Sequence, residues 1–463
     1  MTAVDLVIRG GLLATMDENR RAWHNGSVAI DGAQVLAVGS SEGFEFTGRR
    51  EIDAQGGMIL PGLVCAHTDF QQAPLRGLAE GVHAVRDRMY RLILPFGAHS
   101  TRCRAYAGAR LLLAEQLLGG VTAAGIEHYV HTRGDSIDGV CQAISESGSR
   151  AVVMRLVNDV LEPPYGEPLD RAMGELNRVS SEWSSRRLNI ATGVVGIGYS
   201  SEASLLALHR WAEEHQTLFC IHVPTMHDAT VIAKRGFAGS GIAYHEHLGV
   251  LTPATVVMKP RFDEPDWDIV ARNGAAVVIT PDVANYQGSK WVPMADLQRT
   301  GVRFGVGLDE PIGSPHQSMW LAMRTALLEP RRPSQREPGE GSFGSAGSPE
   351  QILMMGTSSG AEVLRFVGGG RIAPGSLADI MVFDRNGISL NPPEEMVSLL
   401  VHSAGARPAF VIADGRTVVE HGVLQVWDIR DVVQEAADAQ AQIIEEAEAG
   451  GVIRRASVWN YQD

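Results

Sequence analysis

The central part of the chain, from about residue 58 to 365, alternates short apolar runs with helical patterns. The apolar runs read MILPGLVCAH, GVTAAGIEH, RAVVMRLV, NIATGVVGI, TLFCIHV, ATVVMKP, AAVVITP and VRFGVGLD. Such alternation predicts βα units, because parallel strands need a crossover helix between them. About eight strands in roughly 300 residues are typical of one α/β architecture, the (β/α)8 barrel. We therefore predict a (β/α)8 barrel over residues 58–365.

The two ends of the chain have a different texture. Residues 1–57 and 366–428 read as short β-branched runs separated by Gly, Asp and Asn turn signals. This pattern predicts that both ends contribute to one small β-rich domain. Residues 429–463 are predicted to form a C-terminal helix and tail, with an acidic helix over 431–450 that begins at an Asp431–Gln434 cap.

Composition narrows the class of partner. The chain has 40 Lys and Arg against 54 Asp and Glu, a formal net charge of −14, which disfavours nucleic-acid binding. No apolar run reaches the ~18 residues of a membrane span, and the N-terminus lacks the pattern of a secretory signal. The four cysteines are scattered without a CxxC spacing, which suits a reducing compartment. We expect a cytoplasmic protein that binds a small-molecule substrate, and neither a membrane nor nucleic acid.

Potential metal ligands gather at the ends of three predicted strands. Functional side chains of a (β/α)8 barrel sit at the carboxyl ends of its strands. The first strand ends in His67 and Asp69, a later strand ends in His222, and another ends in Asp309. Imidazole and carboxylate groups from converging strand ends suit a divalent metal such as zinc, iron or manganese. The four residues together therefore predict a site for one metal ion, although each alone is a weak signal.

Several motifs resemble those of the amidohydrolase superfamily, in the branch of cytosine deaminases, guanine deaminases and chlorotriazine hydrolases. The segment MILPGLVCAHTD at 58–69 is similar to the opening motif of that branch. The LRGL at 75–78 and the APGSLAD at 373–379 are similar to its later motifs. The resemblance covers about residues 5–428. It implies a metal-assisted barrel, a composite β-sandwich domain built from both termini, and a homodimer or larger homo-oligomer.

The chain departs from the family pattern at three strand ends. Asp69 replaces the second His of the opening motif, and Thr225 stands where the family often has a Glu after the fifth-strand His. The sixth-strand His is missing, and either Met258 or Lys259 takes its place, depending on the register of the strand. Loss of the Glu removes the usual proton shuttle between water and leaving group.

The sequence leaves several roles open for Lys259. Its ammonium group could stabilise a developing oxyanion. If desolvated, Lys259 could have a lowered pKa and act as a base or a Schiff-base nucleophile. The plain structural alternative is an ion pair with Asp282 or Asp309.

Four residues are predicted to bind the substrate. By resemblance, Gln72 corresponds to a pocket glutamine and Asn285 lies in the segment that shapes the pocket floor. His128 ends the second strand together with Glu127, and Thr225 follows the fifth strand.

We weigh three functions. The first is a hydrolase acting on a C–N or related C–X bond of a small cyclic or heterocyclic compound. In this enzyme a metal-activated water attacks, with Asp309 as general base. The second is a metal-independent lyase, isomerase or cyclase on the same scaffold, with Asp69, Lys259, His222 and Asp309 as acid–base groups. The third is a non-catalytic binding protein. The retained Asp309 favours the hydrolase, and the missing sixth-strand His favours the second function.

Overall fold

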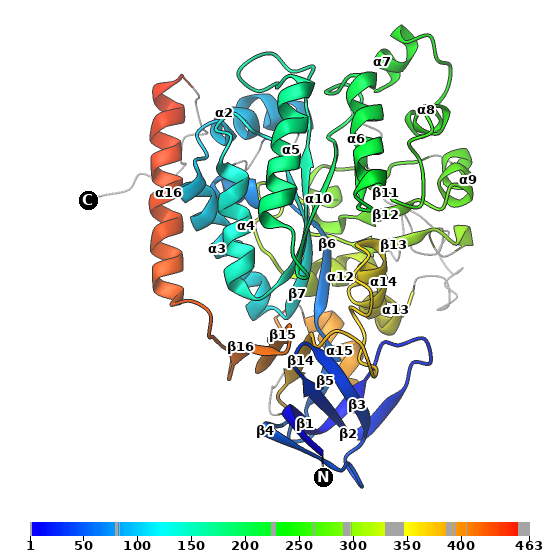
Figure 1. Ribbon diagram of the computed structural model, residues 1–463, viewed down its shortest axis with the longest axis vertical. Coiled ribbons are helices and arrows are strands. Elements are labelled where there is room, and N and C mark those ends of the chain that lie inside the picture. The colour runs from blue at the N-terminus through cyan, green and yellow to red at the C-terminus, as the bar shows by residue number, and fades with distance from the viewer. Residues whose placement is uncertain are drawn as a thin grey trace.

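The computed structural model describes residues 2–78, 82, 84–223, 228–262, 264–289, 297, 299–328, 347–385, 391, 395–403 and 405–451. These residues form a barrel, a separate sheet made by both ends of the chain, and a long C-terminal helix (Figure 1). The segment 330–349, which the sequence predicts to be a mobile loop, lies outside the described residues except for its last three positions.

The barrel is an eight-stranded parallel sheet whose strands follow one another in chain order. Its strands are β6 (Leu63–Thr68), β7 (Val121–His128), β8 (Arg150–Leu156), β9 (Leu188–Val194), β10 (Phe219–His222), β11 (Thr255–Met258), β12 (Ala276–Ile279) and β13 (Arg303–Val306). The ends of the sheet meet where the backbone N–H groups of Leu308 and Asp309 donate to the carbonyl of His67, at 2.7 and 3.0 Å. This arrangement confirms the predicted (β/α)8 barrel.

Helices surround the barrel (Figure 1). They are the short turns η1 (Phe70–Leu75) and η2 (Met89–Ile93), and the helices α1 (Val85–Arg88), α2 (Leu94–Gly97), α3 (Arg102–Leu118), α4 (Ser136–Ser147), α5 (Leu169–Trp183), α6 (Glu202–Glu214), α7 (Asp228–Lys234), α8 (Gly241–His247), α9 (Glu264–Arg272), α10 (Pro281–Tyr286), α12 (Met319–Leu328), α13 (Pro349–Met355) and α14 (Ser358–Val363). One continuous apolar core joins strand residues such as Val153 and Val277 to helix residues such as Leu112 and Leu176. Burial of these side chains holds the helices on the barrel.

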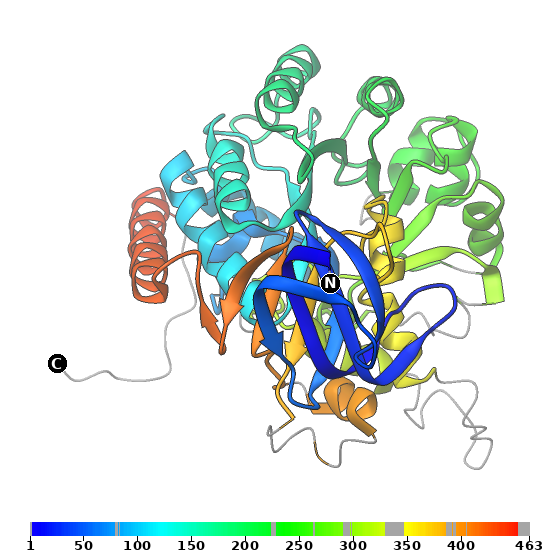
Figure 2. The same ribbon diagram turned by 60° about the horizontal axis from the view of Figure 1, so that its bottom comes forward.

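The second sheet has nine strands and draws on both ends of the chain. Its strands are β1 (Thr2–Ala14), β2 (Ala22–Asp31), β3 (Gln34–Ser40), β4 (Phe46–Asp53), β5 (Met58–Pro61), β14 (Ile380–Phe383), β15 (Phe410–Ala413), β16 (Arg416–Glu420) and β17 (Val423–Leu424), with the helix α15 (Met396–Ser403) between β14 and β15. The two ends join where β14 pairs antiparallel with β5, and Figure 2 shows the N-terminal and C-terminal strands side by side. This terminal sheet is the small composite domain that the sequence predicts.

The strand β5 sets the direction of the barrel. It pairs within the terminal sheet, although the predicted boundary after residue 57 places it in the barrel. The chain then passes through Gly62 directly into β6. A Cβ atom at Gly62 would collide with Thr122, so a glycine allows the close approach there. The amino ends of the barrel strands therefore face the terminal sheet, and their carboxyl ends face away from it (Figure 1).

A buried ion-pair cluster connects the barrel to the terminal sheet. Arg150, the first residue of β8, donates to Asp379 at 2.6 Å and to Asp414 at 2.8 Å. All three side chains are almost completely buried. Asp379 also accepts a hydrogen bond from the backbone N–H of Asp414 at 2.7 Å. The motif at 373–379 therefore ends in a carboxylate that attaches the terminal sheet to the base of the barrel.

The C-terminal helix α16 (Ile429–Ala449) runs alongside α3 (Figure 1). Its cap is Asp428, whose side chain accepts from the backbone N–H of Arg430, so the predicted cap at Asp431 was wrong. Asp428 is favoured because it precedes the first helical residue and is free to take an extended backbone. Farther along the helix, Gln440 donates to the carbonyl of Pro74 at 2.7 Å. The tail thus contacts η1, the turn that directly follows the first barrel strand.

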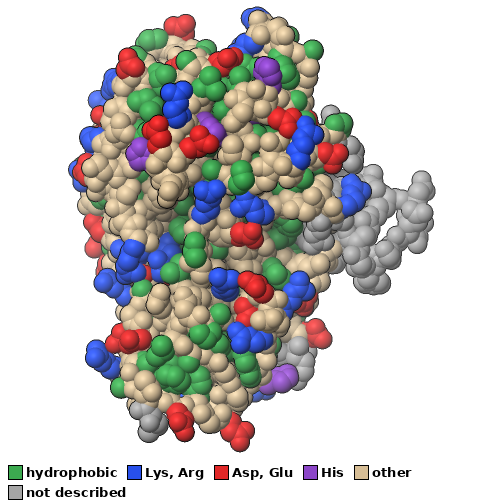
Figure 3. All heavy atoms as spheres, turned by 45° about the vertical axis from the view of Figure 1, so that its right-hand side comes forward, with side chains coloured by type: hydrophobic (Ala, Val, Ile, Leu, Met, Phe, Trp, Pro, Cys, Tyr) green, Lys and Arg blue, Asp and Glu red, His purple; other side chains and the backbone are tan. Residues whose placement is uncertain are grey.

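The surface carries charges of both signs. On the face shown in Figure 3, Lys and Arg side chains are interspersed with Asp and Glu. Among the described residues, no helix combines the length and the apolar character of a membrane span.

Replacement of Arg150 by Ala should destabilise the fold by about 3–5 kcal/mol, because the buried Asp379 would lose its cation and Asp414 would keep only the partly exposed Arg186 and Arg187. The free energy of urea unfolding measures this loss. Arg186→Ala is the matched control, because Arg186 also pairs with Asp414 but its side chain is 62% exposed. That control should lose about 1 kcal/mol or less. Equal losses in the two variants would contradict a structural role for the buried cluster.

Candidate active site

A cavity of about 220 Å³ lies among residues that follow the carboxyl ends of the barrel strands. Its described lining residues are Asp69, Val85, Met89, Ile93, Glu127, Tyr129, Val195, Tyr199, His222, Met258, Lys259, Arg261, Gln287 and Glu310. Apolar side chains and a cluster of charged ones therefore share one small space. This is the end of a (β/α)8 barrel at which enzymes of this architecture place their active sites.

His67, Asp69 and Asp309 converge where the barrel closes. Their ligand atoms all lie within 4.8 Å of one another, and all three residues are buried. Nε2 of His67 is 3.1 Å from Oδ1 of Asp309. Among the described residues, Oδ1 of Asp69 and Oδ2 of Asp309 have no hydrogen-bond partner. Buried polar atoms are normally paired, so these two oxygens indicate a place for a ligand.

A second group shares His67 with the first. Nε2 of His222 lies 2.8 Å from Oε2 of Glu127, and Nδ1 of His67 lies 3.8 Å from Oε1 of the same carboxylate. The thiol of Cys220 also donates to Glu127, at 2.9 Å. Glu127 is buried at the end of β7, so it holds His222 from across the barrel. The predicted four-residue cage therefore divides into two groups, and His222 contacts Glu127 in the second.

Lys259 forms an ion pair with Asp309. Its Nζ lies 2.7 Å from Oδ1 of that residue. Both Met258 and Lys259 line the cavity, although alternation along a strand would send only one of them inward. The reason is that Lys259 has a φ of +50°, a left-handed conformation that ends the alternation of β11. Of the two pairings open to Lys259 from the sequence, Asp309 is the one observed.

The charge of Lys259 is stabilised rather than weakened. Burial alone would lower the pKa of Lys259, but Asp309, Glu310 and Asp69 outweigh burial and raise that pKa. This environment disfavours the hypothesis of Lys259 as a neutral base or Schiff-base nucleophile. Burial makes a lysine neutral only when no nearby carboxylate stabilises its charge, and Lys259 has carboxylates around it.

The acidic groups of the site influence one another strongly. Burial, together with the charges of Glu127 and Asp309, raises the pKa of Asp69 well above its usual value, although His67 opposes this. Burial would lower the pKa of His67, but Glu127 and Asp309 raise that pKa to about 9. Burial also opposes ionisation of Glu127, yet His222 and His67 lower its pKa to about 2. Several carboxylates therefore share a small buried space, and this arrangement favours a bound cation.

The residues present fit one divalent metal. The two unpartnered oxygens of Asp69 and Asp309, together with the imidazole of His67, form a nitrogen and oxygen donor set that suits zinc, iron or manganese. A positive ion among these groups would also offset the repulsion that raises the pKa of Asp69.

The four predicted substrate-binding residues have different outcomes. Gln72 is buried beside the site and donates to Asp69 at 2.9 Å and to the hydroxyl of Tyr129 at 2.6 Å. His128 points to the other side of β7 and lies 2.9 Å from Ser136, away from the cavity, because Glu127 takes the inward position. Asn285 is exposed on α10 and does not line the cavity. Thr225 lies outside the described residues.

Three lining residues that sequence reasoning missed, Glu310, Gln287 and Arg261, form a chain of contacts with Arg88 beside Asp309. Arg88 is fully buried and pairs with Glu310. Gln287 donates to the same oxygen of Glu310 at 2.9 Å, and Arg261 donates to Gln287 at 2.6 Å. Glu310 directly follows Asp309, so its position at a strand end was a usable signal. Arg88 and Gln287 carry no such signal, because only the fold brings α1 and the end of α10 to this edge.

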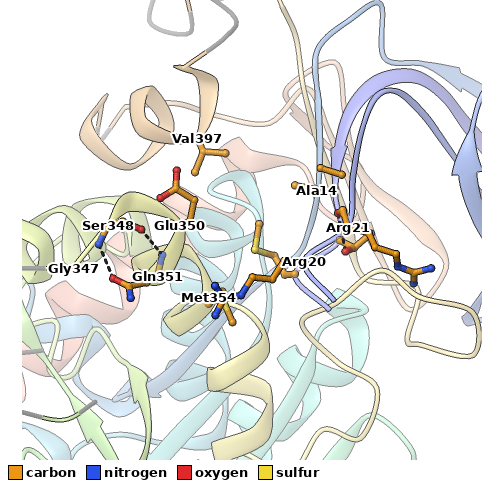
Figure 4. A pocket seen from close by; sticks show the side chains of 12 residues that line it. Ala14, Arg20, Arg21, Gly347, Ser348, Glu350, Gln351, Met354 and Val397 are labelled. Atoms are coloured by element: carbon orange, nitrogen blue, oxygen red, sulfur yellow. Dashed lines mark hydrogen bonds between the residues drawn. The ribbon is translucent and has the colours of Figure 1, made fainter. Parts of the chain in front are cut away.

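A larger cavity of about 590 Å³ lies where the end of β1 faces α13 (Figure 4). Its charged lining residues are Arg20, Arg21 and Glu350. Neither group of candidate metal ligands reaches it, and Ser348 and Gln351 at its edge are engaged in the capping box of α13. Its position and its residues offer no comparable chemistry.

Comparisons with known proteins support the same family as the motifs. The model of the amidohydrolase family matches residues 58–425. A 5-methylthioadenosine/S-adenosylhomocysteine deaminase of Nitratidesulfovibrio vulgaris is 26% identical over 447 residues, which cover 95% of this chain and 98% of that protein. A 5′-deoxyadenosine deaminase of Methanothermobacter thermautotrophicus is 28% identical over 426 residues, which cover 90% of this chain and 95% of that protein.

Solved structures share the fold. An adenosine deaminase from Xanthomonas campestris with bound zinc superposes with a TM-score of 0.85 at 21% identity, covering 96% of this chain and 99% of that one. Atrazine chlorohydrolase from Arthrobacter aurescens, complexed with zinc, gives 0.83 at 21% identity, covering 94% and 100%. The family match and the two deaminases above confirm the predicted enzyme class, a hydrolase acting on non-peptide carbon–nitrogen bonds. The chain belongs to the amidohydrolase family.

Proposed function

We propose that this protein is a metal-dependent hydrolase that removes an exocyclic amino group, or a related leaving group, from a small heterocycle. The observation that carries the proposal is the convergence of His67, Asp69 and Asp309. Within the described part of the chain, the two buried carboxylates each keep an unpartnered oxygen. The metal-independent alternative is not favoured, because the relatives named above are deaminases and a chlorohydrolase.

His67, Asp69 and Asp309 would hold the metal. When bound, a divalent metal supplies Lewis-acid activation of water at neutral pH. Asp309 has one oxygen engaged by Lys259 and His67, while its Oδ2 has no partner and is the acceptor we assign to the water proton. Gln72 donates to Asp69 and so fixes the orientation of that carboxylate.

Glu127 and His222 are the groups we assign to proton delivery. The family's usual carboxylate after the fifth strand is missing here, because Thr225 stands in its place. Glu127 reaches the same region from β7 and holds the imidazole of His222 at 2.8 Å. A carboxylate paired with an imidazole can pass a proton to a departing amine. Both residues line the cavity, so a bound substrate is within their reach.

Lys259 is the group we assign to stabilise negative charge on the reacting ring. Its ammonium lies in the cavity lining and is held at 2.7 Å by Asp309. A fixed cation beside a developing anion lowers the barrier, because it needs no reorientation during the reaction. Lys259 thereby takes over a task that the missing sixth-strand His would perform.

The cavity suits a flat heterocyclic ring. Its apolar lining includes Met89, Val195 and Met258, and Tyr129 and Tyr199 add aromatic surface. Ligand pockets commonly combine such an apolar surface with a few polar groups that fix orientation. Aminopurine nucleosides and amino-substituted triazines are the substrate classes we propose, from the names of the related proteins.

We further propose a cytoplasmic homodimer or larger assembly, which sedimentation of the purified protein would reveal as at least twice the chain mass.

Untagged protein purified without chelator should carry about one zinc, iron or manganese ion per chain, and it should release ammonia from an aminopurine or aminotriazine. Elemental mass spectrometry and an ammonia assay measure the two properties. His67→Ala and Asp309→Asn should lose both, whereas His24→Ala, which changes an exposed histidine of β2, should keep both. Folded wild-type protein that takes up no metal would overturn the proposal.

Replacement of Lys259 by Met should raise the affinity for a divalent metal by at least about tenfold. The ammonium neutralises Asp309, a proposed ligand, and repels a second cation by about 4 kcal/mol per unit charge at 4 Å and an effective dielectric constant of 20. Competition with a chromophoric chelator measures the change. The variant should nevertheless turn over more slowly. Unchanged or weaker metal binding would show that Lys259 and the metal do not compete for Asp309.

Replacement of Glu127 by Gln should lower kcat by about 10²–10⁴-fold, because His222 would lose the carboxylate that supports its proton transfer. KM and metal content should stay near those of the wild type. Glu182→Gln, which changes an exposed carboxylate of α5, is the control. If Glu127→Gln loses its metal together with its activity, Glu127 is a ligand and the proton-transfer role is wrong.

A further inference from the structure

We infer that Arg261 is a specificity-determining residue that binds a carboxylate carried by the substrate ring. The inference rests on the proposed function and adds to it a substrate class, small heterocyclic carboxylates. It concerns a side chain that lies outside the proposed metal and proton-transfer groups.

Arg261 belongs to the cavity because of how β11 ends. The left-handed backbone at Lys259 turns the chain, so Met258, Lys259 and Arg261 all line the same space. A non-glycine residue in this conformation is strained and persists only where the surroundings require it. The turn therefore presents two cationic side chains, two positions apart, to the same bound molecule.

The other cations near Arg261 already have their anions. Lys259 pairs with Asp309, and Arg88, behind the cavity, pairs with Glu310. Arg261 has a neutral partner instead, because its Nη2 donates to the side-chain carbonyl of Gln287 at 2.6 Å. Within the part of the chain that the structure describes, no carboxylate oxygen comes within 4.0 Å of Arg261.

A half-buried guanidinium without an anion is costly. Burial lowers the pKa of Arg261 and the neighbouring charge of Arg88 adds to this effect, while the carboxylates of Asp309 and Glu310, which lie beyond ion-pair distance, offset only part of it. Buried charges in proteins are usually paired, because an unpaired one loses its hydration without compensation. The hydrogen bond to Gln287 fixes one edge of the planar guanidinium. The paired N–H groups of a guanidinium match the two oxygens of a carboxylate. A ligand carboxylate would supply the missing anion.

The size of the cavity places that carboxylate on the ring itself. The enclosed volume of about 220 Å³ is below the ~300 Å³ that is usual for drug-sized ligands. Arg261 lies two residues from Lys259, whose ammonium reaches the proposed reaction centre at Asp309. A substrate that meets both cations therefore carries its anionic group close to the scissile bond rather than on a long tail.

Equilibrium binding to the full-length protein tests the inference without requiring turnover. The probes are an aminopyrimidine, an aminotriazine and an aminopurine carboxylate, each paired with its carboxamide of nearly equal shape. At least one carboxylate should bind the wild type about tenfold or more tightly than its carboxamide. Arg261→Gln should reduce this preference to within about twofold, and Arg261→Lys should keep part of it. Arg416→Gln, which changes an exposed arginine of β16, should keep the full preference.

Two results would overturn the inference. One is a wild type that binds no carboxylate more tightly than its carboxamide. The other is a preference that persists unchanged in Arg261→Gln. Ammonia release is measured in parallel and tests the proposed function separately. Release from neutral heterocycles without any carboxylate preference would overturn the role of Arg261 and leave the deaminase. A preference that depends on Arg261 without ammonia release or bound metal would support the role of Arg261 and overturn the deaminase.

Discussion

The backbone hydrogen bonds that close the barrel decide where the chemistry of this protein is located. The carbonyl of His67 accepts from both Leu308 and Asp309, so the end of β6 and the residues after β13 are held side by side. As a consequence, the side chains of His67, Asp69 and Asp309 meet in one buried group, although Asp309 lies 242 positions after His67 in the chain. The terminal sheet supports this closure from the opposite end, through β5 and the buried Arg150 cluster. The candidate site thus depends on the closed barrel.

Charge pairing explains why so many ionisable groups can be buried at this end. Lys259 pairs with Asp309, Arg88 pairs with Glu310, and His222 contacts Glu127. The cations beside Asp309 and Glu127 lower the pKa of each of these carboxyl groups, whereas burial raises the pKa of Asp69, which has no ion-pair partner among the described residues. Arg261 is the converse case, a cation held by a neutral amide. The two unbalanced groups are the points at which a bound metal and a bound substrate would complete the site.

Much of the site was visible as strand ends. The spacing of His67 and Asp69, and the position of Asp309, predicted residues that the structure brings together. The sequence does not show which of the neighbours Glu127 and His128 faces the cavity. Alternation along β7 separates them: Glu127 faces the barrel interior and His128 packs against Ser136. A regular strand would direct only one of Met258 and Lys259 into the cavity, and the structure does not follow that rule. The left-handed turn at Lys259 lets both residues reach the cavity, and the local sequence does not predict such a turn.

The amino-acid sequence by itself determined the architecture and the family. Periodic apolar runs specify parallel strands and helices, and the strand-end motifs are short enough to be read without knowledge of the fold. Only the tertiary structure decided the partners of each charged group. Arg88 meets Glu310, Lys259 meets Asp309, and Arg261 meets Gln287, all across different βα units. Such pairings depend on distances of a few ångströms between distant segments, and a pattern of residue types along one chain does not contain those distances.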